Sequence, residues 1–492
     1  MLKDELNENG TVQENLYRHV PSLNNLLLGP NFQGLLGTHE RSVVVQATRD
    51  ELIALKRQIA SGQLSQHNLA TYLDLLADRV SERLQSRLRY SLRRVINATG
   101  VLLHTNLGRA PLSTSAIAHL ADVAAGYSNL EQDLETGQRS RRDVHAESLV
   151  LDLLKMRAGA AGQEEEPKAV VVVNNCAAAT FLALDAIARD REVIVSRGEL
   201  VEIGGGFRIP EILAKSGAQL IEVGTTNRTR TADYESAISP ATGLILRVHQ
   251  SNFSMEGFTE RPSLADLVSL GRRVRVPVFE DQGTGLVTSL APQGFPAEET
   301  LLESYRDGVD LIAASGDKLL GGPQCGLLIG RTNLIERIRA NPLLRAFRVD
   351  KLTYAALEAT LIGYLSNQER SIPIIRMLNI TTTEILERSQ RLADSLRSSE
   401  LSAEVVPAFS VIGGGTTPRA KLQSYAVALR HGTSPCQDLL CNLRQLKVPV
   451  IGRICDDRVW LDLRTVEPAL DETLAALLAE LGRPSATSKR QA

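Results

Sequence analysis

The stretch VDLIAASGDKLLGGPQCGLLIG, residues 309–330, decides how the rest of the chain is interpreted. An apolar run ends at a turn of small residues, Lys318 follows in that turn, and two glycines and a proline come next. A lysine at the end of a buried strand lies at the binding edge of a sheet, where loss of solvent lowers the pKa of its amine. Such an amine can attack an aldehyde, so we predict a Schiff-base lysine. On this stretch alone, an exposed loop lysine remains the alternative.

A carboxylate is expected beside this amine. The preceding apolar run, VPVF at 276–279, leads directly into Glu280 and Asp281. A carboxylate that pairs with a pyridinium nitrogen keeps that ring protonated, and a protonated ring acts as an electron sink. We therefore expect Asp281 to bind the ring nitrogen of a pyridoxal cofactor, with a helix or turn cap as the alternative.

A third segment supplies an anchor for phosphate. In VVVNNCAAATFLAL, residues 171–184, Asn175, Cys176 and Ala177 stand where an apolar strand turns into a helix of small residues. Free N–H groups at a helix start attract phosphate, and small side chains let the anion approach. Together with Lys318 and Asp281, this segment completes the three anchors of pyridoxal 5′-phosphate.

Short apolar runs alternate with helix-like stretches from about residue 95 to residue 375. Such runs are typical of strands buried on both faces, so we predict an α/β fold with a mostly parallel, doubly wound sheet. Ligands of such sheets lie beyond the carboxyl ends of the strands, which makes 95–375 the expected catalytic core. The expected strands are 171–175, 193–196, 219–223, 244–248, 276–279, 309–314 and 326–330, and the expected helices between them are 177–189, 207–218 and 263–274.

Smaller parts flank this core. Residues 1–68 have the apolar spacing of a small helical domain, and 69–94 are expected to form a linker helix rich in arginine. Its arginines suit phosphate contacts, although a solvated helix face is the simpler interpretation. Residues 376–481 predict an α+β domain with a helix near 380–398, strands at 424–430 and 457–466, and a closing helix at 468–481. The polar tail 482–492 is expected to be disordered.

Composition limits the class of protein. The chain has 492 residues, 43% apolar content and a formal charge of −2, so any contact with nucleic acid must come from local patches. Its five cysteines show no pairing or metal-ligand spacing, and no metal is expected. The first residues carry no basic segment followed by an apolar run, and we expect a cytoplasmic protein.

Several long motifs resemble the bacterial selenocysteine synthase family, the L-seryl-tRNA(Sec) selenium transferases, which are fold-type-I pyridoxal phosphate enzymes. The likeness runs over nearly the whole chain. The motifs are RRVINATGVLLHTNLGRAPLS (93–113), YSNLEQDLETG (127–137), VNNCAAA (173–179), RGELVEIGGGFRIP (197–210), GTTNRT (224–229), HQSNFSMEGF (249–258), SGDKLLGGPQCG (315–326), NPLLRAFRVDKLTYAALEATL (341–361) and PVIGRICDD (449–457).

This resemblance implies an activity and its residues. Lys318 would carry the cofactor, and Arg109, Arg345 and Arg348 would bind the anionic selenium donor, selenophosphate. The reaction would convert seryl-tRNA(Sec) to selenocysteinyl-tRNA(Sec) through an aminoacrylyl group on the tRNA. The resemblance also implies that the N-terminal domain and its basic linker bind the tRNA, and that the chain forms a homodecamer built from dimers.

Two features depart from the family pattern. Residues 137–142 read Gly-Gln-Arg-Ser-Arg-Arg, where the family usually shows Gly-x-Arg-Gly-Ser-Arg, so substrate contact at this place is left open. Cys325 stands where a small apolar residue is expected.

The segment after 193–196 offers no aromatic or histidine to stack on the cofactor ring, and we assign no residue to that role.

Two other functions are compatible with these residues. The first is a related pyridoxal phosphate lyase that acts on a small β-hydroxy or amino-sugar acid without RNA. The altered stretch 137–142 favours it, whereas the N-terminal domain and the arginines oppose it. The second is a non-catalytic tRNA-binding protein on a decayed enzyme scaffold, which requires Lys318 to be idle.

Overall fold

The computed structural model describes residues 16–64, 66–159, 167–204, 206–287, 289–294, 298–397, 400–416, 420–432 and 434–482. The chain divides into two compact units, Met1–Arg94 and Val95–Ala492, and each is considered by itself. No helix within the described ranges is long and apolar enough to cross a membrane. The predicted disordered tail lies outside the described residues except for Gly482.

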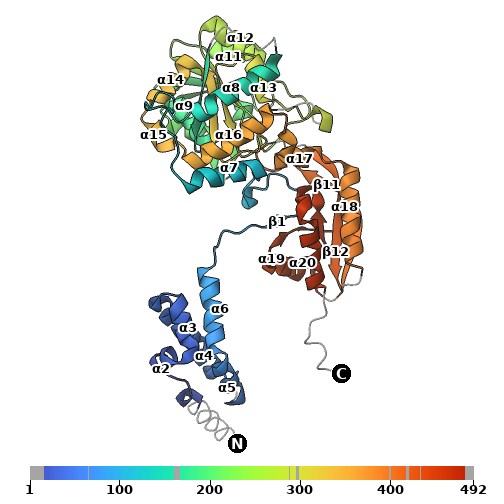
Figure 1. The fold of residues 1–492 in the computed structure, drawn as a ribbon. Helices are drawn as coiled ribbons and strands as arrows, with labels where there is room; N and C mark the ends of the chain where they lie inside the picture. The colour runs from blue at the N-terminus through green and yellow to red at the C-terminus, as the bar shows by residue number, and fades with distance from the viewer. Residues whose placement is uncertain are drawn as a thin grey trace, which may run out of the picture. The chain divides into compact units, whose positions relative to one another are not determined.

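Unit 1 is a small helical domain (Figure 1). Its core is formed by buried apolar side chains such as Val44, Leu55, Ile59, Val80 and Leu84. Most of them recur at helical spacing along α4 and α6, which explains why these two helices pack together. Its helices are α2 (Leu23–Leu28), α3 (Pro30–Thr38), α4 (Arg41–Ala60), α5 (Gln66–Asp74) and α6 (Leu76–Leu88).

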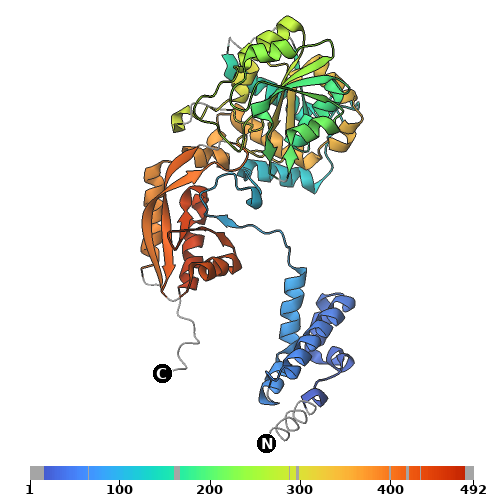
Figure 2. The ribbon, with the colours of Figure 1, turned by 180° about the vertical axis from the view of Figure 1, so that it is seen from behind.

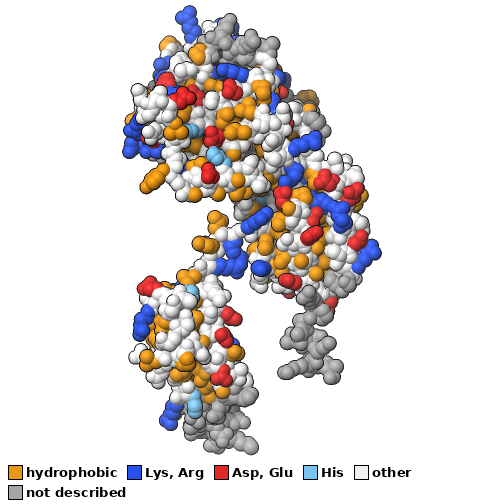
Figure 3. Space-filling view, in the orientation of Figure 1, with side chains coloured by type: hydrophobic (Ala, Val, Ile, Leu, Met, Phe, Trp, Pro, Cys, Tyr) orange, Lys and Arg blue, Asp and Glu red, His pale blue; other side chains and the backbone are white. Residues whose placement is uncertain are grey.

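The prediction of one linker helix over 69–94 was wrong. The helix is interrupted at Leu75 and ends at Leu88, beyond which Tyr90 and Leu92 are 88% and 94% exposed. These apolar residues find no core in the described structure, and a helical turn without tertiary packing is marginal in water. Figure 3 shows Lys and Arg side chains gathered along the segment that follows α6.

Unit 2 is built on a seven-stranded sheet in the order β2-β10-β9-β8-β7-β3-β6. Strand β10 runs antiparallel to β2 and β9, and the pairs from β9 through to β6 are parallel, as expected for a mostly parallel sheet. The strands are β2 (Lys168–Val173), β3 (Glu192–Ser196), β6 (Gln219–Val223), β7 (Thr242–Val248), β8 (Val278–Asp281), β9 (Leu311–Ser315) and β10 (Gly326–Arg331).

Helices cover both faces of this sheet (Figures 1 and 2). One face buries its apolar side chains against α8, α12, α13 and α16, and the other against α9, α10 and α14. The doubly wound α/β fold is therefore confirmed. The helices of this region are α7 (Thr114–Ala125), α8 (Val144–Ala158), α9 (Cys176–Ala188), α10 (Ile209–Lys215), α11 (Thr231–Ala237), α12 (Leu264–Val274), α13 (Leu301–Arg306), α14 (Thr332–Ala340), α15 (Leu343–Phe347), α16 (Lys351–Leu365) and α17 (Pro373–Asn379).

The C-terminal part of unit 2 is an antiparallel four-stranded sheet, in the order β11-β12-β15-β14, packed against helices. Sequence analysis found β12 and β15 but missed the edge strand β11. Its alternating exposed and buried residues include a proline, which weakens the strand pattern. The elements are α18 (Thr382–Ser395), β11 (Leu401–Val411), β12 (Lys421–His431), α19 (Cys436–Gln445), β14 (Arg453–Cys455), β15 (Arg458–Asp462) and α20 (Asp471–Leu481).

Two short pairs of strands complete the fold. β1 (Ile96–Asn97) runs parallel to β13 (Val450–Ile451), which ties the start of unit 2 to its C-terminal part. β4 (Glu202–Ile203) and β5 (Phe207–Arg208) form an antiparallel pair beyond the end of β3. Residues 95–98 thus pack with the C-terminal sheet, although the sequence placed them at the start of the core.

Candidate active site

A cavity of about 280 Å³ lies where β8, β9 and the start of α9 meet. All the predicted site residues except Arg345 and Arg348 line it, and we call it the Lys318 cavity. Its lining residues are Arg109, Asn175, Cys176, Ala177, Gly204, Val248, His249, Ser251, Asp281, Gly283, Ser315, Asp317, Lys318 and Gln324.

Lys318 stands in the tight turn after β9 and is only 7% exposed. Its Nζ donates a hydrogen bond to the carbonyl oxygen of Gly415, 2.8 Å away, in the loop between β11 and β12. Burial lowers the pKa of this amine, although Cys176 and Asp281 act in the opposite direction. The amine is thus held by the C-terminal part and is biased toward its neutral, nucleophilic form.

Asp281 is the last residue of β8 and is also buried. The Thr180 hydroxyl donates to one carboxylate oxygen over 2.9 Å, and the Cys176 thiol donates to the other over 3.4 Å. Burial raises the pKa of Asp281, while these two donors and the nearby Lys318 lower it. A protonated ring nitrogen is the type of partner that would stabilise this buried charge.

Helix α9 begins beside this carboxylate. Asn175 is its N-cap, with a side-chain oxygen that accepts from the Ala178 N–H over 2.8 Å. Cys176 and Ala177 open the first turn, where backbone N–H groups have no carbonyl partner within the helix. Burial raises the pKa of the Cys176 thiol well above its usual range, so this cysteine acts as a neutral donor.

Glycines allow the segments around the cavity to approach closely. Gly285, at φ +67°, lies against the β9 turn, and a Cβ there would stand 2.2 Å from the carbonyl oxygen of Ser315. A Cβ on Gly326 would stand 2.2 Å from the carbonyl oxygen of Asn175. The turn that carries Lys318 and the start of α9 are therefore held in place by contacts that any larger residue would break.

Arg109 reaches the cavity from a left-handed turn, with φ +62°, just after Gly108. Its guanidinium forms a 2.8 Å ion pair with Asp317, the residue before Lys318, and remains one third exposed. The backbone of the same turn is tied to Asp317 as well, because the Ala110 N–H donates to its carbonyl oxygen. Arg109 thus places a positive charge beside Lys318.

The structure does not place Arg345 and Arg348 in the lining of this cavity. The backbone of Arg348 bridges to Val173 at the end of β2, two residues before Asn175, which lines the cavity. Its side chain points to Glu131, with 3.5 Å between Nη1 and Oε1. Arg345 is exposed on α15.

The altered stretch 137–142 meets the same carboxylate. Arg142 and Arg139 each approach Glu131 to 2.7 Å. We call Glu131, Arg139, Arg142 and Arg348 the Glu131 cluster. Arg139 and Arg142 therefore fold back onto YSNLEQDLETG, whereas Arg141 pairs with Glu147 and Glu336. The glycine that the family pattern expects is replaced by Ser140, whose N–H donates to the carbonyl oxygen of Glu131.

Sequence analysis missed His249. It follows β7 as Asp281 ends β8, so the rule for the carboxyl ends of parallel strands could have found it. Its backbone N–H donates to the carbonyl oxygen of Asp281 over 3.0 Å, and its Nε2 lies 3.4 Å from Glu298. Its buried Nδ1 has no hydrogen-bond partner among the described residues.

A buried amine and a buried carboxylate at neighbouring strand ends, beside a helix start, define the site of a fold-type-I pyridoxal phosphate enzyme. Residues 95–467 match the family model described as L-seryl-tRNA selenium transferase. The chain therefore belongs to the L-seryl-tRNA selenium transferase family, and its cofactor is pyridoxal 5′-phosphate.

Similar proteins agree with this assignment. An L-seryl-tRNA(Sec) selenium transferase of Geobacter metallireducens is 43% identical over 95% of this chain and 99% of its own length. The enzyme of the same name from Aquifex aeolicus is 43% identical over 89% of this chain and 94% of its own. Among solved structures, D-glucosaminate-6-phosphate ammonia-lyase matches 81% of this chain and 98% of its own, at 20% identity and a TM-score of 0.54. This last likeness supports the fold.

Proposed function

We propose that this chain converts seryl-tRNA(Sec) to selenocysteinyl-tRNA(Sec), with selenophosphate as the selenium donor. The observation that carries the proposal is the buried pair of Lys318 and Asp281 in one cavity, in a chain that aligns almost end to end with enzymes of that name. A decayed, non-catalytic scaffold would have no reason to keep a buried lysine whose pKa is lowered by burial.

The residues of the Lys318 cavity fit the cofactor. Lys318 would bind its aldehyde carbon, Asp281 its ring nitrogen, and the first N–H groups of α9, at Cys176 and Ala177, its phosphate. Asp281 suits this role because it is already oriented by Thr180 and Cys176. When bound, the cofactor supplies an electron sink for charge that develops at the seryl Cα.

Lys318 would also move the proton. As a free amine at this place, Lys318 would accept the proton from the seryl Cα. Burial lowers the pKa of this amine, which raises the fraction of it that is neutral and able to accept a proton. The carbonyl oxygen of Gly415 fixes where the amine points before that step.

Arginines would bind the selenium donor. Arg109 is already held beside Lys318 through Asp317. Arg345 lies on the short helix α15, and Arg348 directly follows it. The backbone of this segment bonds to the end of β2, next to Asn175. Guanidinium groups match a phosphate-like anion in both charge and geometry. For all three arginines to contact the donor, Arg345 and Arg348 would have to move toward the Lys318 cavity.

The remaining expectations complete the proposal. Unit 1 and the arginine-rich segment after α6 would bind the tRNA, and subunits would assemble as a homodecamer built from dimers in the cytoplasm. In unit 1, Arg83 and Arg87 pair with Glu51 and Asp50, and the segment beyond α6, where Lys and Arg side chains gather, is the basic patch that we assign to RNA. Phosphate contacts of this type depend strongly on salt.

The alternative of a lyase for a small acid, without RNA, is less well supported. Relatives with about 40% identity over nearly the whole chain are named for seryl-tRNA(Sec), whereas the lyase structure is only 20% identical. The altered stretch 137–142, which had favoured the lyase, is accommodated by the Glu131 cluster.

A turnover assay tests the proposal. The holoenzyme is incubated with seryl-tRNA(Sec) and selenophosphate, and selenocysteinyl-tRNA is quantified after hydrolysis of the ester. We expect product from seryl-tRNA(Sec) and little or none from a bulk serine tRNA charged with serine. Lys318→Ala should abolish product formation. Its matched control is Lys215→Ala, which changes an exposed lysine at the end of α10 and should keep activity. Absence of product with all tRNAs, from a protein that retains its cofactor, would refute the proposal.

A further inference from the structure

A second cavity, of about 490 Å³, opens at the same edge of the sheet. It is lined from the ends of β3, β6 and β7, whereas the Lys318 cavity lies at the ends of β8 and β9. In the sheet these strands are contiguous, in the order β9-β8-β7-β3-β6. His249, just after β7, lines both cavities, so the second cavity is the immediate neighbour of the first.

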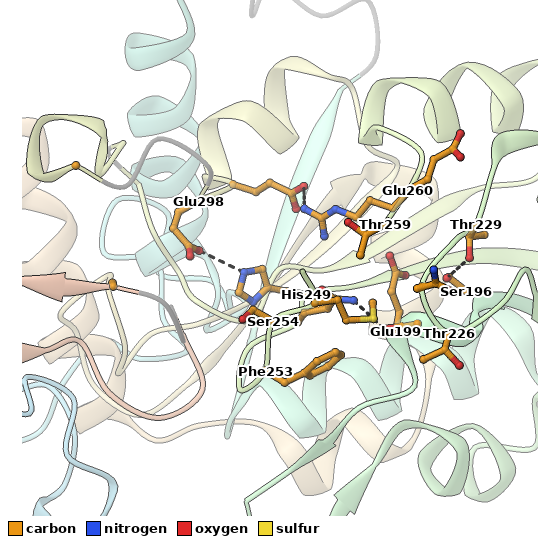
Figure 4. A pocket seen from close by; sticks show the side chains of 18 residues that line it. Ser196, Glu199, Thr226, Thr229, His249, Phe253, Ser254, Thr259, Glu260 and Glu298 are labelled. Carbon is orange, nitrogen blue, oxygen red and sulfur yellow. Dashed lines mark hydrogen bonds and ion pairs between the residues drawn. The ribbon is translucent and has the colours of Figure 1, made fainter. Parts of the chain in front are cut away.

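The walls of the second cavity are rich in hydroxyl and amide groups. Figure 4 shows the His249 imidazole on one side, next to Glu298, with Thr226 and Ser196 on the other and the Phe253 ring between them at the bottom of the view. Other lining residues carry side chains that can donate and accept hydrogen bonds; they are Asn227, Thr229, Gln250, Ser254 and Thr259. One aromatic face among many hydrogen-bonding groups is typical of sites for a planar, polar ligand.

The charged side chains of the second cavity limit which ligand it can bind. Glu199, Glu260, Glu298 and Glu299 all line the cavity, so a phosphate group would meet several carboxylates. Three of these carboxylates, Glu199, Glu260 and Glu299, already pair with arginines, so a cation gains little there as well. Glu199 and Glu299 pair with the buried Arg247, Glu260 with Arg228 and Arg230, and Glu298 with His249.

Among the described residues, no group of His, Cys, Asp and Glu could hold a metal ion. The cavity therefore suits an uncharged ligand with several hydrogen-bond donors and a flat ring. A nucleoside has these properties, because its base stacks on aromatic rings while its edge and its ribose hydroxyls form hydrogen bonds.

We propose that this second cavity binds the terminal adenosine of the aminoacyl-RNA substrate, with the base against Phe253. The inference rests on the proposed function and assigns a place to one part of its substrate. The serine of an aminoacyl-tRNA is esterified to the ribose of that adenosine, so a seryl amine at Lys318 requires the nucleoside directly outside the Lys318 cavity. The wall at His249 is where the ester passes from one cavity to the other.

Binding of small probes to the full-length holoenzyme tests this inference. The probe is 3′-deoxy-3′-(L-alanylamido)adenosine, which has a stable amide and no β-hydroxyl to lose, and the comparison is L-alaninamide. Calorimetry gives both dissociation constants. We expect the adenosine probe to bind at least about fivefold more tightly, since stacking of one base contributes about 1–3 kcal/mol, or roughly 5- to 150-fold.

Variants test whether the tighter binding of the adenosine probe arises in this cavity. Phe253→Ala is expected to remove most of the gain in affinity without changing the affinity for L-alaninamide, whereas Phe253→Tyr should keep that gain. Phe409→Ala, an exposed aromatic on β11, is the matched control and leaves both affinities unchanged. Because Phe253 also packs against the core, Thr226→Trp serves as a second variant that fills the cavity from an exposed position. It is expected to cause the same selective loss.

Equal binding of the two probes would overturn the inference, as would a gain that persists in both Phe253→Ala and Thr226→Trp. The turnover assay with seryl-tRNA(Sec) is measured on the same preparation. Turnover without an adenosine gain refutes this inference and leaves the proposed function intact. An adenosine gain without turnover supports the cavity and counts against the proposed function.

Discussion

The Lys318 cavity and the Glu131 cluster position their charged side chains in different ways. In the cavity, Lys318 and Asp281 are buried at strand ends whose places are set by the backbone pairing of β8 with β9. In the cluster, Arg139, Arg142 and Arg348 gather around one partly exposed carboxylate, and Arg142 also donates to the carbonyl oxygen of Val349. The first arrangement is rigid and costly to disturb, and the second is held by pairs that solvent weakens.

This difference has a functional meaning. A group that exchanges a proton with Cα has to be held in place, because a displacement of about 1 Å costs much of the rate. Arginines that receive a diffusing anion gain from freedom to close on it. We therefore expect changes in the Lys318 cavity to affect turnover strongly, and changes in the Glu131 cluster to affect mainly the binding of the selenium donor.

The largest effect is expected for Asp281→Asn. Loss of the carboxylate removes the proposed partner of the cofactor's ring nitrogen, and turnover should fall by about 10²-fold or more. Steady-state assays with seryl-tRNA(Sec) measure it, together with the visible absorbance of the bound cofactor. Asp266→Asn, at an exposed helix cap on α12, is the control and should keep full turnover. Nearly normal turnover in Asp281→Asn would contradict the role of this carboxylate.

Two glycines with similar backbone angles, one in each region, are expected to differ in how much an alanine substitution lowers the free energy of unfolding. Gly285 and Gly137 have φ of +67° and +69°, but a Cβ on Gly285 would stand 2.2 Å from a backbone oxygen, while that on Gly137 meets nothing within 4 Å. Gly137→Ala should cost about 1 kcal/mol, the price of a left-handed angle alone. Gly285→Ala should cost about 3 kcal/mol or more, because the turn has to move. Urea unfolding measures both, and equal costs would show that the close approach is not tight.

These glycines also show what could be predicted from the sequence. The strands of the sheet, Lys318, Asp281 and the start of α9 were predicted because apolar runs reveal buried strands, and parallel strands end at one edge. The hydrogen bond from Lys318 to Gly415 could not be predicted. It depends on how the C-terminal part packs on the core, which no local pattern records.

The same limit applies to the arginines. Arg109 was named from the resemblance, but its partner Asp317 follows only from the fold. Arg348 and the altered stretch 137–142 meet at Glu131, across more than 200 residues in the case of Arg348. Single exposed pairs of this kind have no signature in composition or periodicity. His249 is different, since its position after β7 did carry a signal.

The pH dependence of stability sharpens the comparison at Lys318. Burial lowers the pKa of this amine in the folded chain below 10.5, its ordinary value in the unfolded chain. Between those two values the unfolded chain binds more protons, so stability rises with pH, by at most about 1.4 kcal/mol per pH unit. In the cofactor-free protein, Lys318→Met should therefore be more stable than the wild type at neutral pH, with a difference that shrinks as the pH approaches 10. A difference independent of pH would argue that the amine is well solvated.

The smallest effect is expected for Glu131→Gln. The pairs of Glu131 are partly exposed, so their loss should destabilise the fold by about 1 kcal/mol or less. Arg348 would lose its orientation, and the half-saturating selenophosphate concentration should rise by up to about fivefold with kcat nearly unchanged. Glu235→Gln, which breaks the exposed pair with Arg273, is the control and should change neither value. A larger loss in kcat than in donor affinity would place Glu131 in the chemistry itself.

The central claim, that Lys318 is the residue which carries the cofactor, can be measured directly. The holoenzyme is reduced with borohydride, which fixes the cofactor to its lysine, and the digested peptides are analysed by mass spectrometry. We expect the phosphopyridoxyl group on the peptide that contains Lys318, at close to one group per chain. Recovery of the group on another lysine, such as Lys351, or on none, would contradict the assignment of this site.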